Sequence, residues 1–248
     1  MPGRRPCAGR AAVSGSAHAA YPDKPIKLIS PFPPGGQVAN IAYLGNVTVG
    51  IFASATTPFT TFNEVVAYTK ANPGKLAFSS PGIGSVSHLA GELLWARAGI
   101  KLVHVPYAGN SAQMSDLVSG QHQIAMSGMV SALPYSKDGR TRLLGVVGPT
   151  RSKLVPNVPA IGETTPGYDA PAWLGIVAPA GLPREAQDRL EAVAQQALND
   201  AETKKALEGQ GVDLNVITAK AFSVKIKGDM PLWEEAVKAA GGPPAPGK

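Results

Sequence analysis

Serine and histidine residues near position 85 have the side chains that nucleophilic chemistry uses. Ser85, Ser87 and His88 stand close together, and a serine beside a histidine is the usual pairing of a nucleophile with its base. Their spacing argues against this role. Within one helix, residues i and i+1 diverge and residues i and i+3 are only neighbours, and no Gly-x-Ser-x-Gly turn is present. We therefore expect no enzyme, and we expect His88 to pack on its helix or to bond a loop carbonyl.

Metal and nucleotide sites find little support in the sequence. The chain has four histidines and one cysteine, which leave a metal site little to build from. Gly82 and Gly84 resemble part of a phosphate loop, but no Gly-Lys-Ser/Thr sequence follows and no third glycine stands at dinucleotide spacing. His104 lies in an apolar stretch and is expected to be a core or rim histidine. We expect neither a metal nor a cofactor.

Three loops rich in glycine, serine and proline indicate capture of an anion. They cover residues 33–36, 79–85 and 106–111, and each stands between an expected strand and an expected helix. Ligands of open α/β sheets bind where such loops leave the strands, and the unpaired amides of a helix N-terminus favour negative charge. The loops therefore predict an anion site.

Alternating strands and helices must position the last two loops. Thr61 and Glu64 predict a capping box for a helix over 61–71, and apolar residues at helical spacing predict a second helix that ends at Gly99. Further helices are expected over 111–118 and from 131, with strands over 75–79, 101–105, 122–126 and 141–147. This alternation is typical of βαβ units in a parallel sheet. We expect residues 55–148 to form one complete lobe.

The two ends of the chain are expected to form a second unit, here called the first lobe, from residues 21–54 and 149–240. A strand over 25–30 has no neighbouring partner in sequence, and the stretch 173–178 offers one. Helices are expected over 183–198, 202–208 and 221–239, and a disordered tail over 241–248. Two crossings between lobes predict a hinged molecule with the loops facing a cleft.

Composition excludes several classes of protein. Of 248 residues, 44% are hydrophobic and 16% charged, which is typical of a globular chain. The net charge of +6 comes partly from arginines before residue 20, and no dense basic stripe predicts nucleic acid binding. No apolar run reaches the roughly 18 residues of a membrane span. Residues 1–20 read as a degenerate signal segment, because the apolar centre is short.

Short motifs in order from Tyr21 to about Leu214 match one family. They read YPDKPI at 21–26, PFPPGG at 31–36, ANPGK at 71–75, HLAGE at 88–92, VPY at 105–107, PNVP at 156–159 and APAG at 178–181. Together they resemble the periplasmic solute-binding proteins of tripartite tricarboxylate transporters, the Bordetella uptake family.

The resemblance implies a fold, a ligand and partners. The fold would be an α/β, two-lobed periplasmic binding protein, type II-like and hinged. The protein would be a periplasmic monomer that binds a small organic acid, such as a tricarboxylate or dicarboxylate, and delivers it to membrane transporter subunits. The expected ligand-binding residues are Phe32, Pro34, Gly35, Gly36, Ser79, Gly82, Ile83, Gly84, Ser85, Tyr107, Ser127 and Gly128.

One departure from the family pattern concerns the first lobe. Ala39 occupies the place of a family aspartate, and residues 41–45 already resemble the segment that crosses between lobes. The difference corresponds to two βαβ steps, on the order of 60 residues, so we expect an internal deletion after Gly36 and a truncated first lobe beside a complete second lobe. Two alternatives to a receptor stay open: a non-functional remnant, or a repurposed anion-responsive module that pairs through an exposed sheet edge.

Overall fold

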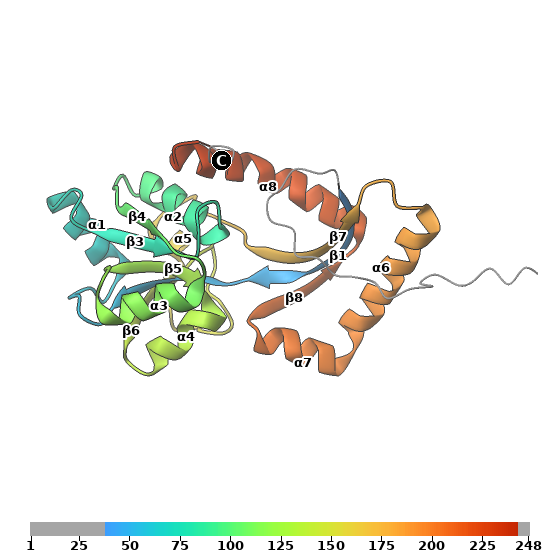
Figure 1. Ribbon diagram of the computed structural model, residues 1–248, viewed down its shortest axis with the longest axis horizontal. Helices are drawn as coiled ribbons and strands as arrows, with labels where there is room; N and C mark the ends of the chain where they lie inside the picture. Colours follow the sequence, from blue (N-terminus) through green and yellow to red (C-terminus); the bar gives the residue numbers. More distant parts are fainter. Residues whose placement is uncertain (1–37, 243–248) are drawn as a thin grey trace, which may run out of the picture.

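The computed structural model describes residues 38–242, which form two lobes (Figure 1). The signal segment, the expected strand over 25–30 and four expected site residues lie outside this range: Phe32, Pro34, Gly35 and Gly36. None of the helices in residues 38–242 combines the length and the apolar character that a membrane crossing requires.

The second lobe is built on a sheet of five strands in the order β4-β3-β5-β2-β6. The strands are β2 (Val49–Ser54), β3 (Ala77–Ser80), β4 (Val103–Pro106), β5 (Ile124–Gly128) and β6 (Thr141–Val146). β3 runs parallel to β4 and β5, but β2 is antiparallel to both of its neighbours. The four expected strands therefore run in one direction, and β2, which was not expected in this sheet, lies antiparallel between β5 and β6. The chain enters this lobe at the edge where the parallel strands end, so β2 must run against them.

Four helices of this lobe follow the expected pattern: α1 (Phe62–Ala71), α2 (Val86–Arg97), α3 (Asn110–Ser119) and α4 (Met129–Lys137). The capping box of α1 is present, because the Glu64 amide donates to Thr61 Oγ1 (3.3 Å) and the Thr61 amide donates to Glu64 Oε2 (3.0 Å). α2 ends at Arg97, two residues before Gly99, whose φ of 66° suits glycine.

An aromatic cluster fills the core between α2 and the sheet. Phe78 meets Trp95 edge-on at a centroid distance of 5.4 Å, and Phe62 stacks on Trp95 at 6.1 Å. All three side chains are buried, and so is every residue of β2. Full burial of such side chains stabilises the fold by about 1.5–3 kcal/mol each, so this lobe has a substantial core of its own.

The first lobe has a smaller sheet of three antiparallel strands in the order β7-β1-β8. These are β1 (Val38–Val47), β7 (Trp173–Pro179) and β8 (Val212–Ile217), covered by α6 (Arg184–Asn199), α7 (Ala201–Gly209) and α8 (Ala219–Ala239). The helices were expected, but β8 was not, since polar residues interrupt its apolar pattern. α8 extends from this lobe onto the second lobe (Figure 1), where Ala236 is buried in the core.

The boundary between the lobes differs from the expected one. β2 was assigned to the first lobe, but it pairs with β5 and β6, so the five-stranded sheet begins at Val49. The short helix α5 (Ile161–Thr164) and Tyr168 also belong to the second lobe, because Ile161 and Tyr168 are buried in its core. The physical reason is the antiparallel strand, whose pairing cannot be deduced from local sequence. The division into lobes remains a proposal, with its first boundary moved to residue 48.

Candidate functional site: an anion-binding edge of the second lobe

The parallel strands of the second lobe end at the edge where the chain crosses from the first lobe. Gly128, the last residue of β5, pairs with Val49, the first residue of β2. The Met129 amide donates to the Thr48 carbonyl oxygen at 2.9 Å, and Thr48 directly follows β1. The loops after β3, β4 and β5 therefore gather at the junction between the lobes, the position where open α/β sheets bind ligands.

The loop before α2 is held by its own hydrogen bonds. Gly84 has a φ of 76°, and its amide donates to His88 Nδ1 at 3.1 Å. The Ser85 amide donates to the Gly82 carbonyl at 3.2 Å, and Ser85 Oγ caps the helix by accepting the His88 amide at 3.2 Å. The amides of Gly84 and Ser85, expected to bind ligand, are thus already used. His88 bonds a loop amide and not the expected carbonyl.

Three other amides of this segment remain as donors. Within the described residues, the N–H groups of Ile83, Val86 and Ser87 have no hydrogen-bond partner. Two of them belong to the first turn of α2, where orphan amides point out of the helix end. Ile83 is 63% exposed, so the loop can be reached from solvent.

The loop before α3 contributes the ring of Tyr107, because the hydroxyl of this residue is bound within its own lobe. The hydroxyl of Tyr107 donates to Asp116 Oδ2 at 2.8 Å and lies 3.3 Å from His122 Nδ1. Burial, together with the Asp116 carboxylate, raises the pKa of Tyr107 to about 12. The phenol is therefore a neutral donor committed to its own lobe, and only the ring is left to shape a pocket.

Asn110 is a site residue that the sequence analysis missed. It opens α3, and its Oδ1 accepts the buried Ser127 hydroxyl at 3.1 Å, which joins the loops after β4 and β5. No acceptor for Asn110 Nδ2 lies among residues 38–242. Gly128 leads directly into α4, whose first turn has no side-chain cap. An asparagine immediately after Gly109, at the end of a loop, is the signal that would have found it.

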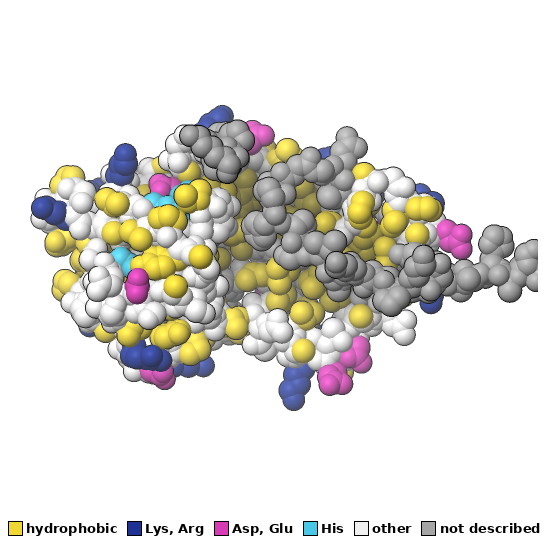
Figure 2. Space-filling model, viewed as in Figure 1, with side chains coloured by type: hydrophobic (Ala, Val, Ile, Leu, Met, Phe, Trp, Pro, Cys, Tyr) yellow, Lys and Arg dark blue, Asp and Glu magenta, His cyan; other side chains and the backbone are white. Residues whose placement is uncertain are grey.

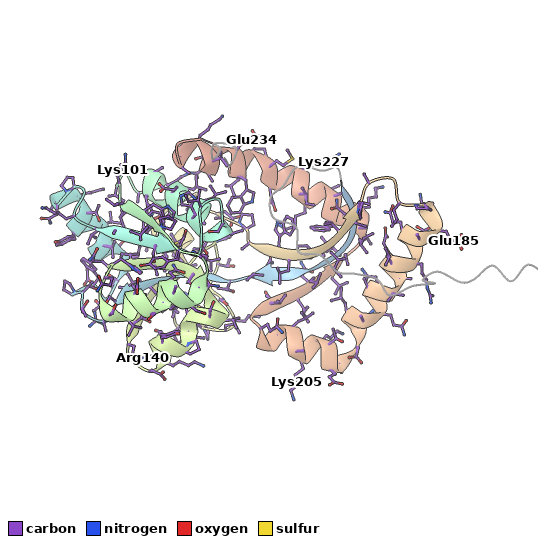
Figure 3. The ribbon with its side chains drawn as sticks, in the orientation of Figure 1. Lys101, Arg140, Glu185, Lys205, Lys227 and Glu234 are labelled. Carbon is purple, nitrogen blue, oxygen red and sulfur yellow. The ribbon has the colours of Figure 1, made fainter. Side chains whose placement is uncertain are left out.

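The electrostatics of this edge favour an anion. α2, α3 and α4 carry no acidic residue in their first turns, whereas α1, α5, α6 and α7 each carry a glutamate there. The loops after β3, β4 and β5 contain no lysine or arginine. Attraction therefore comes from helix dipoles and amides. Of the charged side chains labelled in Figure 3, Lys101 and Arg140 lie on the outer side of the second lobe and Glu185 and Lys205 on the outer side of the first lobe, whereas Lys227 and Glu234 lie on α8, which spans both lobes.

Ser79 lies below this edge, inside the lobe. Its Oγ is 2.7 Å from His122 Nε2, a distance typical of a nucleophile and its base. Ser79 and His122 are buried, however, and the side chain of Gln113 donates to both Oγ and the carbonyl of Ser79 (3.1 and 2.9 Å). The expected role of Ser79 as a ligand donor is therefore wrong, because its hydroxyl is enclosed by these partners.

Comparison with known proteins identifies the family of this chain. The description "Tripartite tricarboxylate transporter family receptor" applies to a family that matches residues 13–241. The chain belongs to this family. A relative from Pseudomonas sp. (strain P51), a UPF0065 protein in the tcbD-tcbE intergenic region, is 32% identical over 219 residues, which cover 88% of this chain and 63% of the relative.

Solved structures agree with this membership. The periplasmic binding protein BugD is 27% identical with a TM-score of 0.72, over 82% of this chain and 69% of that one. R. palustris Rpa4515 with adipate shares the fold at 23% identity and a TM-score of 0.76, over 85% and 71% of the two chains. The expected two-lobed α/β receptor fold is confirmed. The chain spans less than two thirds of the length of the Pseudomonas relative.

In this family member the structure brings most of the expected second-lobe residues together. Gly82, Ile83, Gly84 and Ser85 lie at the same edge as Ser127 and Gly128. The backbone of Tyr107 joins them, since its amide donates to the Ser80 carbonyl at 3.0 Å. Ser79 is the exception. The site combines backbone amides at the N-termini of α2, α3 and α4 with two polar side chains, those of Asn110 and Ser127.

Proposed function

We propose that this chain is an extracytoplasmic solute receptor that binds a small carboxylate and delivers it to a tripartite tricarboxylate-type membrane transporter. One observation carries the proposal. Three helix N-termini without acidic residues meet at the edge that faces the junction with the first lobe. A carboxylate that accepts several amide hydrogen bonds there is held without a salt bridge.

The binding mode follows from the free donors. The amides of Ile83, Val86 and Ser87 would hold one carboxylate, and Asn110 Nδ2 would reach it from α3. Binding needs no cofactor and no covalent step, so we expect no turnover. The partner is a membrane transporter, as the family description implies, and the working location is the periplasm. The ligand class is a small organic acid, a class to which the adipate of the R. palustris structure belongs.

Calorimetry of the full chain against mono-, di- and tricarboxylates tests the proposal. We expect binding of at least one di- or tricarboxylate and no consumption of it. Asn110→Asp places a negative charge at the site and should abolish binding. Asn157→Asp makes the same charge change on an exposed loop and should leave binding unaltered. A folded chain that binds none of these acids would favour the remnant, and turnover lost in Ser85→Ala would show an enzyme.

A further inference from the structure

Two stacked histidines lie directly beneath the loop at 81–85. The rings of His88 and His104 are 4.0 Å apart between centroids and inclined by 27°, and Phe78 packs against His104 at 4.8 Å. His88 stands in the first turn of α2, and His104 stands on β4. The pair is thus held by two elements that both lead to the anion-binding edge. In Figure 2, histidine side chains of this lobe reach the surface beside acidic side chains.

Each imidazole contacts a different end of the loop. His88 Nδ1 accepts the Gly84 amide at 3.1 Å, so this nitrogen must be unprotonated. His104 Nε2 is 2.8 Å from Ser80 Oγ, which accepts the Gly82 amide at 3.3 Å and lies 3.1 Å from the Gly82 carbonyl oxygen. A proton on His88 Nδ1 would remove the acceptor of the Gly84 amide.

We propose that His88 and His104 are positioning residues for the carboxylate site: as a neutral stacked pair they hold the 81–85 loop in its binding shape, and protonation of the pair releases it. The inference rests on the proposed function for its ligand. The hydrogen bonds from which the inference is argued are formed within the protein and need no ligand.

The surroundings of the pair disfavour a positive charge. Burial lowers the pKa of His88, and burial followed by the neighbouring His88 lowers the pKa of His104 to about 4. Glu92 Oε1 lies 3.8 Å from His88 Nε2, and burial raises the pKa of Glu92 against the opposing effect of Lys101. Lys70, Glu92, Lys101 and His104 line one pocket of about 830 Å³ beside β4.

The direction of the pH effect follows from these pKa values. An opened loop exposes imidazoles with an ordinary pKa of 6.5, whereas the closed loop keeps that of His104 near 4. The open form therefore binds more protons in this range, and the closed loop loses stability as the pH falls from about 6.5 towards 4.

NMR of the full, ligand-free chain tests the hydrogen bonds directly. At pH 7.5 we expect an unprotonated Nδ1 on His88 and a protected Gly84 amide. Between pH 6.5 and 4.5 its protection factor should fall up to roughly tenfold, the equivalent of one hydrogen bond. A proton on His88 Nδ1 at pH 7.5, or a Gly84 protection factor that does not change with pH, would overturn the proposal.

Variants separate positioning from a general structural role. His88→Asn places an amide oxygen near the Nδ1 position and cannot titrate, so Gly84 protection should persist and its pH dependence should weaken, because only His104 of the pair still titrates. His88→Leu removes the acceptor and should lower protection at all pH values. His122→Gln alters a buried histidine that does not contact this loop and serves as the control. An unchanged pH profile in a folded His88→Asn chain would refute the inference.

Ligand binding then distinguishes this inference from the proposed function. If the chain binds a carboxylate, His88→Leu should weaken binding up to roughly tenfold and His88→Asn should restore it. If the unaltered chain binds none, the proposed function fails, while the Gly84 protection profile still decides whether the histidine pair holds the loop.

Discussion

The strand by which the chain enters the second lobe and the strand by which it returns to the first lobe have opposite environments. All six residues of β2 are buried between β5 and β6. No residue of β7 is buried, and Leu174 and Val177 are 45% and 36% exposed although both are apolar. Within the described residues, β7 has β1 as its only strand neighbour. The second lobe thus completes its own core, whereas the described part of the first lobe leaves apolar strand surface open.

The largest difference that this comparison predicts is in hydrogen exchange. Amides of β2, β3 and β5 should exchange only on global unfolding of their lobe, whereas those of β7 and β8 should exchange through local opening. Local and global opening free energies differ by several kcal/mol in most domains, so protection should differ by several orders of magnitude. Limited proteolysis should likewise cut the first lobe before residues 75–147. Preferential cutting inside 75–147 would refute the contrast.

The second-largest effect is expected on the affinity for organic acids when the first lobe is restored. Each charge-assisted hydrogen bond lost from the far side of the cleft costs about 1.5–3 kcal/mol, or roughly one to two decades in affinity. We expect the unaltered chain to bind organic acids only weakly, with a Kd in the millimolar range or above. Grafting the corresponding segment of a longer relative between Gly36 and Ile41 should restore tight binding in calorimetry. Submicromolar affinity without the graft would show that no such segment is needed.

A matched pair of core substitutions sharpens the comparison. Phe78→Ala empties a fully buried site in the second lobe and should cost about 3–5 kcal/mol of its unfolding free energy. Phe222→Ala removes a buried ring that packs on Tyr43 and Trp173 in the first lobe. We expect Phe222→Ala to disorder the first lobe and to leave the second lobe folded. Thermal unfolding followed by the fluorescence of single-tryptophan chains that keep Trp95 or Trp173 would report the two lobes. A single shared transition in both variants would contradict their independence.

The smallest effect is expected at an ion pair that joins the lobes. Arg97 on α2 donates to Glu235 on α8 at 2.7 Å and to the Gly167 carbonyl at 2.6 Å. Since both side chains are partly exposed, Arg97→Ala should cost only about 0–1 kcal/mol of stability. It should nevertheless loosen α8 from the second lobe, seen as faster exchange at 232–239. Arg140→Ala breaks a pair with Asp138 inside one lobe and should leave that exchange unchanged.

Local sequence was enough to predict much of the second lobe. The capping box at Thr61, the glycine that ends α2 and the alternation of strands and helices predicted α1 to α4 within a few residues. These features depend on neighbours in the chain, which sequence displays directly. The gathering of the loops after β3, β4 and β5 at one edge followed for the same reason, because the ends of parallel strands meet at one edge whatever the pairing order.

The tertiary structure decided what depends on distant residues. Only strand pairing shows that β2 runs antiparallel in the second lobe and that β8 lies beside β1. Only packing shows that Ser79 is enclosed by His122 and Gln113 and that the Gly84 amide is held by His88. A residue type and its spacing determine which hydrogen bonds a side chain can make. Which of them it does make depends on the partners that the fold brings within about 3 Å, and these come from positions that the sequence does not place side by side.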